Sequence, residues 1–270
     1  MIKKVSKVPA GRERLSQVLQ HAGDIVRIED AEKALQLQRL DASKLLARWA
    51  GQGWLRRVGA GAYAPVPLDS LQSEQVLGDP WVLIPVLFAP AYVGGRTAAE
   101  YWDLTEQIFR DIVVYTARAT RAKTQVRHGT IFTLKQCAES QQFGTKIIWR
   151  EKTRVHVSDV HRTIIDMLAD PSVGGGIQHV EDCFGQYLKR PDADWKLLLS
   201  YATRLDNGAV FKRLGFLAER KNLPATVLDE CRKALTKGNV KLDPSMQCPR
   251  LVTRWRLFVP DTWARGRNDR

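Results

Sequence analysis

The sequence predicts a mixed α/β (α+β) protein in which an N-terminal winged helix-turn-helix precedes a larger domain of mixed strands and then helices. Three observations lead to this prediction. Three amphipathic segments and a glycine-containing hairpin follow one another before residue 67. Apolar runs of strand length dominate from about residue 80 to 158. Helical segments with capping residues then continue to about Leu235.

The first two helical segments are predicted at about Arg12–Ala22 and Glu29–Leu37. Leucine and valine recur at three- and four-residue spacing in the first segment, which ends at Gly23. Acidic residues fill the first turn of the second segment, where they complement the helix dipole. Both segments are therefore expected to be amphipathic helices.

The third helix lies in the stretch LDASKLLARWAGQGWLRRVGAGAYAP, which runs from Leu40 to Pro65. Asp41 is the expected N-cap, and Gly53 is the expected left-handed stop. An apolar stripe between them is predicted to be buried and consists of Ala42, Leu45, Leu46 and Trp49. The opposite face presents short or cationic side chains, namely Ser43, Lys44, Ala47 and Arg48. Such a face, without an acid after the cap, suits the major groove of DNA, because acidic side chains would repel phosphates.

A basic hairpin is predicted directly after this helix. WLRRV forms its first strand, with Arg56 and Arg57 adjacent, and GAG makes a tight turn before the second strand, AYAP. Three helices followed by a hairpin is the order of a helix-turn-helix with a wing. We therefore expect a winged-helix DNA-binding domain over residues 1–67, a linker or connecting helix over 68–79, and a C-terminal domain over 80–270.

The C-terminal domain is predicted to place strands before helices. AYVGGRTAAEYWDL is expected to form a strand, a glycine turn and a helix, and more strands are expected in FRDIVVYTA, QVRHGTIFTLKQ and TKIIWREKTRVHV. Helices are then predicted near residues 158–171, 178–188, 195–204, 209–221 and 225–235. The stretch from Gly238 mixes arginine with tryptophan, which is consistent with a nucleic-acid surface or with a final strand and a basic end.

The charge of the chain favours a polyanionic partner. Lysine and arginine exceed aspartate and glutamate by 13, and the pI is about 9.8. Each phosphate that such residues neutralise releases condensed counterions. Residues 1–67 hold 12 basic and 6 acidic residues. The N-terminal lysines Lys3, Lys4 and Lys7 are candidates for an arm along the DNA backbone or for a disordered tail.

Membrane, secreted and disulfide-rich classes are not expected. No apolar run reaches the roughly 18 residues of a membrane span, and no apolar segment follows the N-terminal lysines. The four cysteines are widely spaced and are expected to be reduced and mostly buried: Cys137, Cys183, Cys231 and Cys248. We expect a cytoplasmic protein.

No pattern in the chain is typical of a cofactor or metal site. VGGG before Ile177 lacks the lysine and the hydroxyl residue that a phosphate-binding loop needs. Two pairs come closest to metal-ligand spacing but lack further ligands, His156 with His161 and His179 with Cys183.

A metal-dependent nuclease centre is also not predicted. Asp111 lies on an expected strand, but no acid-x-lysine pair follows it. Glu151 and Lys152 are adjacent, so they are expected on opposite faces of a strand. Asp159 and Asp166 are interpreted as a cap and a solvent-exposed charge. We therefore expect no enzyme, no cofactor and no metal.

Four blocks of the sequence resemble the AbiEi antitoxin family of type IV, AbiE-type toxin–antitoxin and abortive-infection (phage-defence) systems. The blocks are RRVGAGAYAP, PAYVGGRTAAEYWDLTEQ, SDVHRTIIDMLADPSVGGG and AVFKRLGFLAER. The likeness spans roughly residues 10–235. It implies a transcription regulator whose winged helix binds double-stranded DNA at inverted repeats in its own promoter and acts as a repressor. It also implies a C-terminal domain that counters a nucleotidyltransferase-like toxin without a stable complex.

The resemblance places the DNA contacts on particular residues of this chain. They are Ser43, Lys44 and Arg48 of the third helix and Arg56 and Arg57 of the wing, with Gln38 and Arg39 before the helix as weaker candidates. The antitoxic surface has no motif of its own. Arg96, Lys212 and Arg213 lie inside the matching blocks and are either part of that surface or solvated charges.

Three other functions remain open at this point. The chain is alternatively a transcriptional regulator with a ligand-sensing second domain, a nuclease-like enzyme, or a winged helix that docks a protein.

Overall fold

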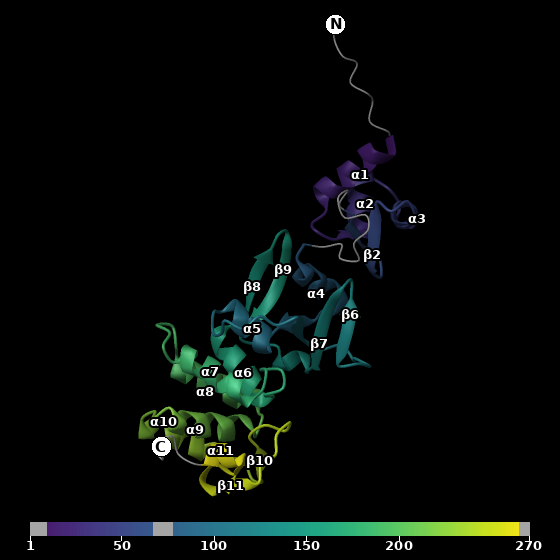
Figure 1. Ribbon diagram of the computed structural model, residues 1–270. Helices are drawn as coiled ribbons and strands as arrows, with labels where there is room; N and C mark the ends of the chain where they lie inside the picture. The colour runs from purple at the N-terminus through teal and green to yellow at the C-terminus, as the bar shows by residue number, and fades with distance from the viewer. Residues whose placement is uncertain (1–9, 67–77, 265–270) are drawn as a thin grey trace. The chain divides into compact units, whose positions relative to one another are not determined.

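The computed structural model of the chain describes residues 10–66 and 78–264 (Figure 1). The chain forms two compact units. Unit 1 comprises residues 1–90, 126–130 and 147–155, and unit 2 comprises residues 91–125, 131–146 and 156–270. The predicted mixed α/β class is confirmed, because helices and three separate sheets occur. The lysines Lys3, Lys4 and Lys7 and most of the predicted linker over 68–79 lie outside the described residues.

Unit 1 contains the three helices and the hairpin that were predicted before residue 67. The elements are α1 (Ala10–His21), β1 (Val26–Arg27), α2 (Ile28–Leu35), α3 (Arg39–Gly51), β2 (Leu55–Gly59) and β3 (Ala62–Pro65). The strands form an antiparallel sheet in the order β1-β3-β2. The strand β1 was not predicted, because two residues are too short for an alternating pattern.

The predicted apolar stripe of α3 is confirmed. All four of its members are buried, with exposed fractions of 9% or less: Ala42, Leu45, Leu46 and Trp49. They pack in one core with Val18 of α1 and Val26 of β1. At about 1.5–3 kcal/mol for each large side chain removed from water, this stripe holds α3 in place and leaves its other face to solvent.

Unit 1 also contains the turn between β8 (Thr145–Arg150) and β9 (Thr153–Ser158). The expectation that Glu151 and Lys152 lie on opposite faces of a strand is wrong, because both residues lie in the turn. Glu151 has a φ of 52°, and the Lys152 N–H donates to Asp24 Oδ2 at 2.9 Å.

A six-stranded mixed sheet, most of it in unit 2, contains all the strands that were predicted between residues 91 and 158. The remaining strands are β4 (Ala91–Val93), β5 (Asp111–Thr116), β6 (Thr124–Arg127) and β7 (Thr130–Gln136). The order is β6-β7-β5-β4-β9-β8, with β5 parallel to β7 and β4 antiparallel to β5. Because β5 and β7 are parallel and Thr116 pairs with Gln136, their carboxyl ends lie at one edge of the sheet.

Helix α6 is central to unit 2. The helices of this unit are α5 (Gly95–Tyr101), α6 (Val160–Ala169), α7 (Ile177–Tyr187), α8 (Trp195–Leu205), α9 (Val210–Arg220) and α10 (Ala225–Lys233). Every residue of α6 from Val160 to Leu168 is buried, and the helix packs against α5, α7, α8 and α9 (Figure 1). The predicted helices after residue 158 are therefore confirmed, with ends that differ by a few residues.

The C-terminal stretch forms a small sheet against α9. Its elements are β10 (Val240–Lys241), β11 (Arg250–Val252), η3 (Thr253–Trp255), β12 (Leu257–Val259) and α11 (Asp261–Ala264), with strand order β10-β12-β11. Trp255 is fully buried over Gly215 of α9, where a Cβ atom would stand 2.1 Å from the indole ring. Trp263 is also buried. These two tryptophans are thus core residues and not stacking surfaces for bases.

Two further expectations concern the class of protein, namely whether it spans a membrane and whether its cysteines form disulfides. In the part of the chain that the structure describes, none of the helices combines the length and the apolar character needed to span a bilayer. All four cysteines are free, and only Cys137 is not fully buried, as predicted.

Candidate nucleic-acid interface

The exposed face of α3 consists of Leu40, Asp41, Lys44, Ala47 and Arg48. These residues recur at three- and four-residue spacing, which places them on one side of the helix. Leu40 is 65% exposed, an unusual state for a leucine on a helix whose other leucines are buried. It was missed at the sequence level, although its place outside the apolar stripe was a usable signal.

The prediction that Asp41 caps α3 is wrong. The helix begins at Arg39, and the N-cap residue is Gln38, three residues before Asp41, without a side-chain cap hydrogen bond. Asp41 therefore lies in the first turn, where its charge complements the helix dipole. It also lies one turn before Lys44, so the exposed face carries an acid that the prediction did not place there.

The weaker candidates before the helix differ in their surroundings. Gln38 is exposed. Arg39 is 65% exposed, but its Nη1 lies 2.7 Å from Glu29 Oε1 and 3.7 Å from Glu32 Oε2 on α2. The hydrogen bond from Arg39 lowers the pKa of Glu29 below its ordinary value. Ser43 is half-buried at the side of the exposed face.

The hairpin exposes one of its two arginines more than the other. Arg56 is half-buried and Arg57 is exposed, while Leu55 and Val58 on either side are buried. The pairing of β2 with β3 shifts between Arg57 and Gly59, so the strand does not alternate strictly between buried and exposed residues. Gly61 in the turn has a φ of 65°, which favours glycine there.

The three cations of unit 2 that were named from the family blocks, Arg96, Lys212 and Arg213, all have protein partners. Arg96 bridges to Asp111, and its Nη1 donates to Ser172 O at 3.0 Å. Lys212 is 1% exposed, and its Nζ donates to Gly238 O at 2.9 Å. Both interpretations given for these residues, an antitoxic surface or a solvated charge, are therefore wrong for Lys212.

Arg213 is likewise buried, with 4% of its surface exposed, and it links two elements. Its Nη1 donates to Leu168 O at 2.8 Å, at the carboxyl end of α6, and its Nε donates to Leu242 O at 2.9 Å. An arginine at this position satisfies carbonyls that the end of a helix leaves without partners. Burial lowers the pKa of Arg213.

Asp166 is a buried ion-pair partner, so its interpretation as a solvent-exposed charge is wrong. Asp166 and Arg162 are both 1% exposed, and Arg162 Nε lies 2.8 Å from Asp166 Oδ1. Tyr92 donates its hydroxyl to Asp166 Oδ2 at 3.1 Å and accepts from Arg162 Nη2 at 2.9 Å. Burial raises the pKa of Asp166 to about 6, and the nearby Arg162 charge only partly offsets it.

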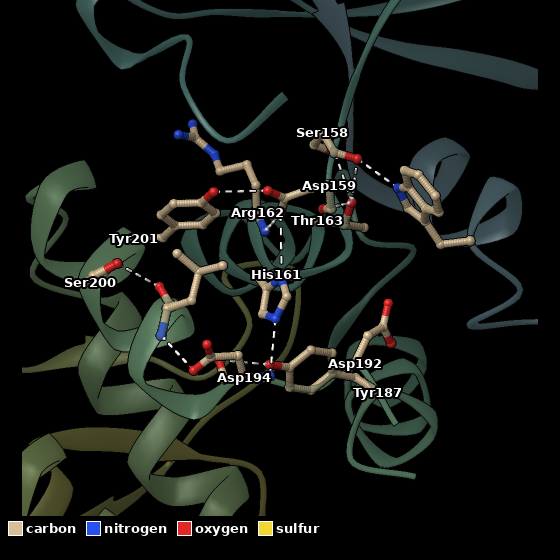
Figure 2. Close-up of polar contacts among 12 residues, drawn as sticks. Ser158, Asp159, His161, Arg162, Thr163, Tyr187, Asp192, Asp194, Ser200 and Tyr201 are labelled. Atoms are coloured by element: carbon tan, nitrogen blue, oxygen red, sulfur yellow. Dashed lines mark hydrogen bonds and ion pairs between the residues drawn. The ribbon is translucent and has the colours of Figure 1, made fainter. Parts of the chain in front are cut away.

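A second polar cluster surrounds the start of α6, and Figure 2 shows it. Asp159 caps the helix as predicted, because its Oδ1 accepts from the Arg162 N–H at 2.8 Å. His161 Nε2 accepts from the Asp194 N–H at 3.0 Å, so the lone pair that a histidine base would use is occupied. Tyr201 donates to Asp159 Oδ2 at 2.9 Å. These contacts tie α6 to α8 and to the segment before α8.

His179, one of the residues at metal-ligand spacing, contacts groups other than Cys183. His179 Nδ1 lies 2.5 Å from Gly174 O, and its Nε2 lies 2.9 Å from Thr105 Oγ1. Among the described residues, no group of three or more histidine, cysteine, aspartate or glutamate side chains is placed to hold a metal ion.

Comparison with known proteins supplies one likeness of fold. No family model and no curated protein matches the chain. Among solved structures, the chain is similar to the crystal structure of the RV2827C protein from Mycobacterium tuberculosis, with 13% sequence identity and a TM-score of 0.61. The match covers 93% of this chain and 92% of that chain. At this identity the likeness shows a common mixed α/β fold along nearly the whole length.

Proposed function

We propose that the chain is a cytoplasmic winged-helix DNA-binding antitoxin that represses its own operon in a type IV toxin–antitoxin system. The observation that carries the DNA half is the exposed, partly cationic face of α3 within the order α1-β1-α2-α3-β2-β3. In this proposal α3 is the recognition helix and the β2–β3 hairpin is the wing.

The side chains on α3 suit both contacts with phosphates and contacts with base edges. Lys44 and Arg48 supply cations for phosphates or for the acceptor edge of guanine. Leu40 offers an apolar surface to a thymine methyl group, and Asp41 can accept from the amino group of cytosine. Arg57 on the hairpin anchors the backbone of double-stranded DNA at the inverted repeats of the promoter.

The antitoxin half rests on the resemblance of the four sequence blocks. Because Lys212 and Arg213 are buried, the surface that counters a nucleotidyltransferase-like toxin consists of other residues. The proposal includes no stable complex between the two proteins.

A salt-series binding titration tests the DNA half. The full chain is titrated with the DNA upstream of its own gene and with scrambled DNA of equal length. We expect tighter binding to the upstream DNA. Arg48→Ala should weaken that binding by about 1–3 kcal/mol if Arg48 contacts a guanine, whereas Arg57→Gln should weaken binding to both DNAs alike and reduce the salt slope by about 1. Lys196→Gln, which removes an exposed lysine of α8, is the matched control. Equal and weak binding to both DNAs would refute operator recognition.

Co-expression tests the antitoxin half separately. We expect the neighbouring gene to encode a nucleotidyltransferase-like toxin whose growth arrest is relieved by the full chain. Relief should persist in the Arg48→Ala variant when both genes are transcribed from promoters foreign to the operon. Growth arrest that persists in the presence of the wild-type chain contradicts the antitoxin role and leaves the DNA result unaffected.

A further inference from the structure

A cavity of about 340 Å³ opens in unit 2 beside the carboxyl ends of the parallel strands β5 and β7. The last turns of α6 and the segment that follows α8 complete its wall. In sheets with parallel strands, ligands bind outside the carboxyl ends of the strands. The volume lies at the lower end of the range for small-molecule sites, about 300–1,000 Å³.

One buried polar group on the cavity wall has no partner. Tyr115 is 5% exposed, and its hydroxyl makes no hydrogen bond to any of the described residues. The ring is fixed, because it stacks on Tyr92 at 4.8 Å between ring centroids. Burial raises the pKa of Tyr115, so the phenol stays neutral and keeps a proton to donate. A buried hydroxyl without a partner costs roughly 1–3 kcal/mol, which a ligand acceptor would recover.

The other polar groups on the wall also offer donors. Gln141 Oε1 accepts from the Ala138 N–H at 3.2 Å, and Asn207 Oδ1 accepts from the Ala209 N–H at 3.0 Å. These bonds fix the orientation of both amides, so their NH₂ groups remain as donors. Lys135 Nζ uses one of its three donors on Asp170 Oδ2 at 2.5 Å.

Two of the carboxylates on the wall already accept hydrogen bonds from neighbouring side chains. Asp166 accepts from Arg162 and Tyr92, and Asp170 accepts from Lys135 and Ser172. Together with Asp206, these carboxylates outnumber the two cations on the wall, Lys135 and Arg162. A phosphate would meet an excess of negative charge.

We infer that this cavity binds an uncharged heterocycle of the nucleobase type, free or as a nucleoside. Such a ring presents carbonyl and ring-nitrogen acceptors to Tyr115, Gln141 and Asn207, and an apolar face to Ala169 and Leu205. The inference does not depend on the proposed DNA binding.

Calorimetric titration of the full chain tests the inference. The probes are uracil, cytosine and adenine, their three nucleosides, and uridine 5′-monophosphate. We expect at least one base or nucleoside to bind. Comparison of each free base with its nucleoside shows which of the two the site accepts. Binding of none of the six, or tighter binding of the monophosphate than of uridine, overturns the inference.

A pair of hydroxyl deletions locates the binding. Tyr115→Phe should weaken binding about tenfold without lowering the free energy of unfolding, because the hydroxyl that it removes has no partner in the protein. Tyr187→Phe is the matched control, since the Tyr187 hydroxyl donates to Asp194 O at 3.2 Å and does not line the cavity. It should leave binding unchanged. Unaltered binding by the Tyr115→Phe variant shows that the cavity is not the site.

Discussion

Helices α3 and α6 both carry basic residues among leucines and alanines, yet they use these residues in opposite ways. Lys44 and Arg48 of α3 are exposed, whereas Arg162 of α6 is 1% exposed and bonded to Asp166 one turn later. In α3 the two residues that lie four positions apart, Lys44 and Arg48, are both cations, and the apolar stripe covers only the opposite side of the helix. In α6 an acid follows the arginine by four residues, and apolar residues surround the pair. In α6 the acid one turn away pairs with Arg162 inside the core, whereas in α3 the side away from the apolar stripe leaves Lys44 and Arg48 in solvent.

Removing one positive charge from α6 and one from α3 should give the largest contrast in the free energy of unfolding. Arg162→Met should lower the free energy of unfolding by about 3–5 kcal/mol, because Asp166 is left buried without its ion partner. Arg48→Met should change it by less than about 0.5 kcal/mol. Urea denaturation measures both. The double variant Arg162→Met, Asp166→Leu should recover most of the loss, and equal small effects in the two single variants would contradict the comparison.

The buried acid of α6 should make the stability of the protein depend on pH. Burial raises the pKa of Asp166 from its ordinary 3.8 to about 6, so the folded state holds this proton more tightly than the unfolded state. The contribution of Asp166 to stability should thus fall by about 3 kcal/mol as pH rises from 4 to 6 and stay constant above.

The same denaturation series at several pH values checks this result. In the Asp166→Asn variant the fall in stability between pH 4 and 6 should be missing. A slope that Asp166→Asn does not alter would show that Asp166 does not carry the proton.

A smaller effect is expected when an exposed cation of α3 is compared with a buried one of α9. Lys44→Gln should change the free energy of unfolding by less than about 0.5 kcal/mol and reduce the salt slope of DNA binding by about 1. Lys212→Gln removes the donor to Gly238 O and should lower stability while leaving the salt slope unchanged. Denaturation and binding titrations on the same preparations separate the two effects. A change of salt slope in the Lys212 variant would place that residue at the surface.

The smallest effect concerns Arg39, which is exposed but held by Glu29. Glu29→Gln should release the guanidinium toward a phosphate and raise DNA affinity by less than about fivefold. A fall in affinity in the same titration would mean that the ion pair orients Arg39 on the DNA.

The sequence predicted most helices and strands because periodicity and capping residues are local signals. The stripe of α3, the helices after residue 158 and the Asp159 cap are examples. Burial of Lys212 and Arg213 was not predicted, because their partners lie at distant positions, such as Leu168 O for Arg213. The i,i+4 spacing of Arg162 and Asp166 within an apolar helix is a local signal that predicts their ion pair.

The candidate DNA surface was predicted in part. Lys44, Arg48 and Arg57 are exposed as expected, while the start of α3 at Arg39 moved Asp41 from the cap to the exposed face. The cap lies three residues before the predicted one, and this shift at a helix end changes the charge of a surface.

The seating of Trp255 over Gly215 has a consequence for protein synthesis. Ribosomes make the chain from its N-terminus, so α9 leaves the exit tunnel before the Trp255 ring that covers Gly215. During that interval the bare surface at Gly215 is a target for chaperones and proteases. A chain that ends before Trp255 keeps this surface uncovered, and the cell can recognise and remove it as an incomplete product.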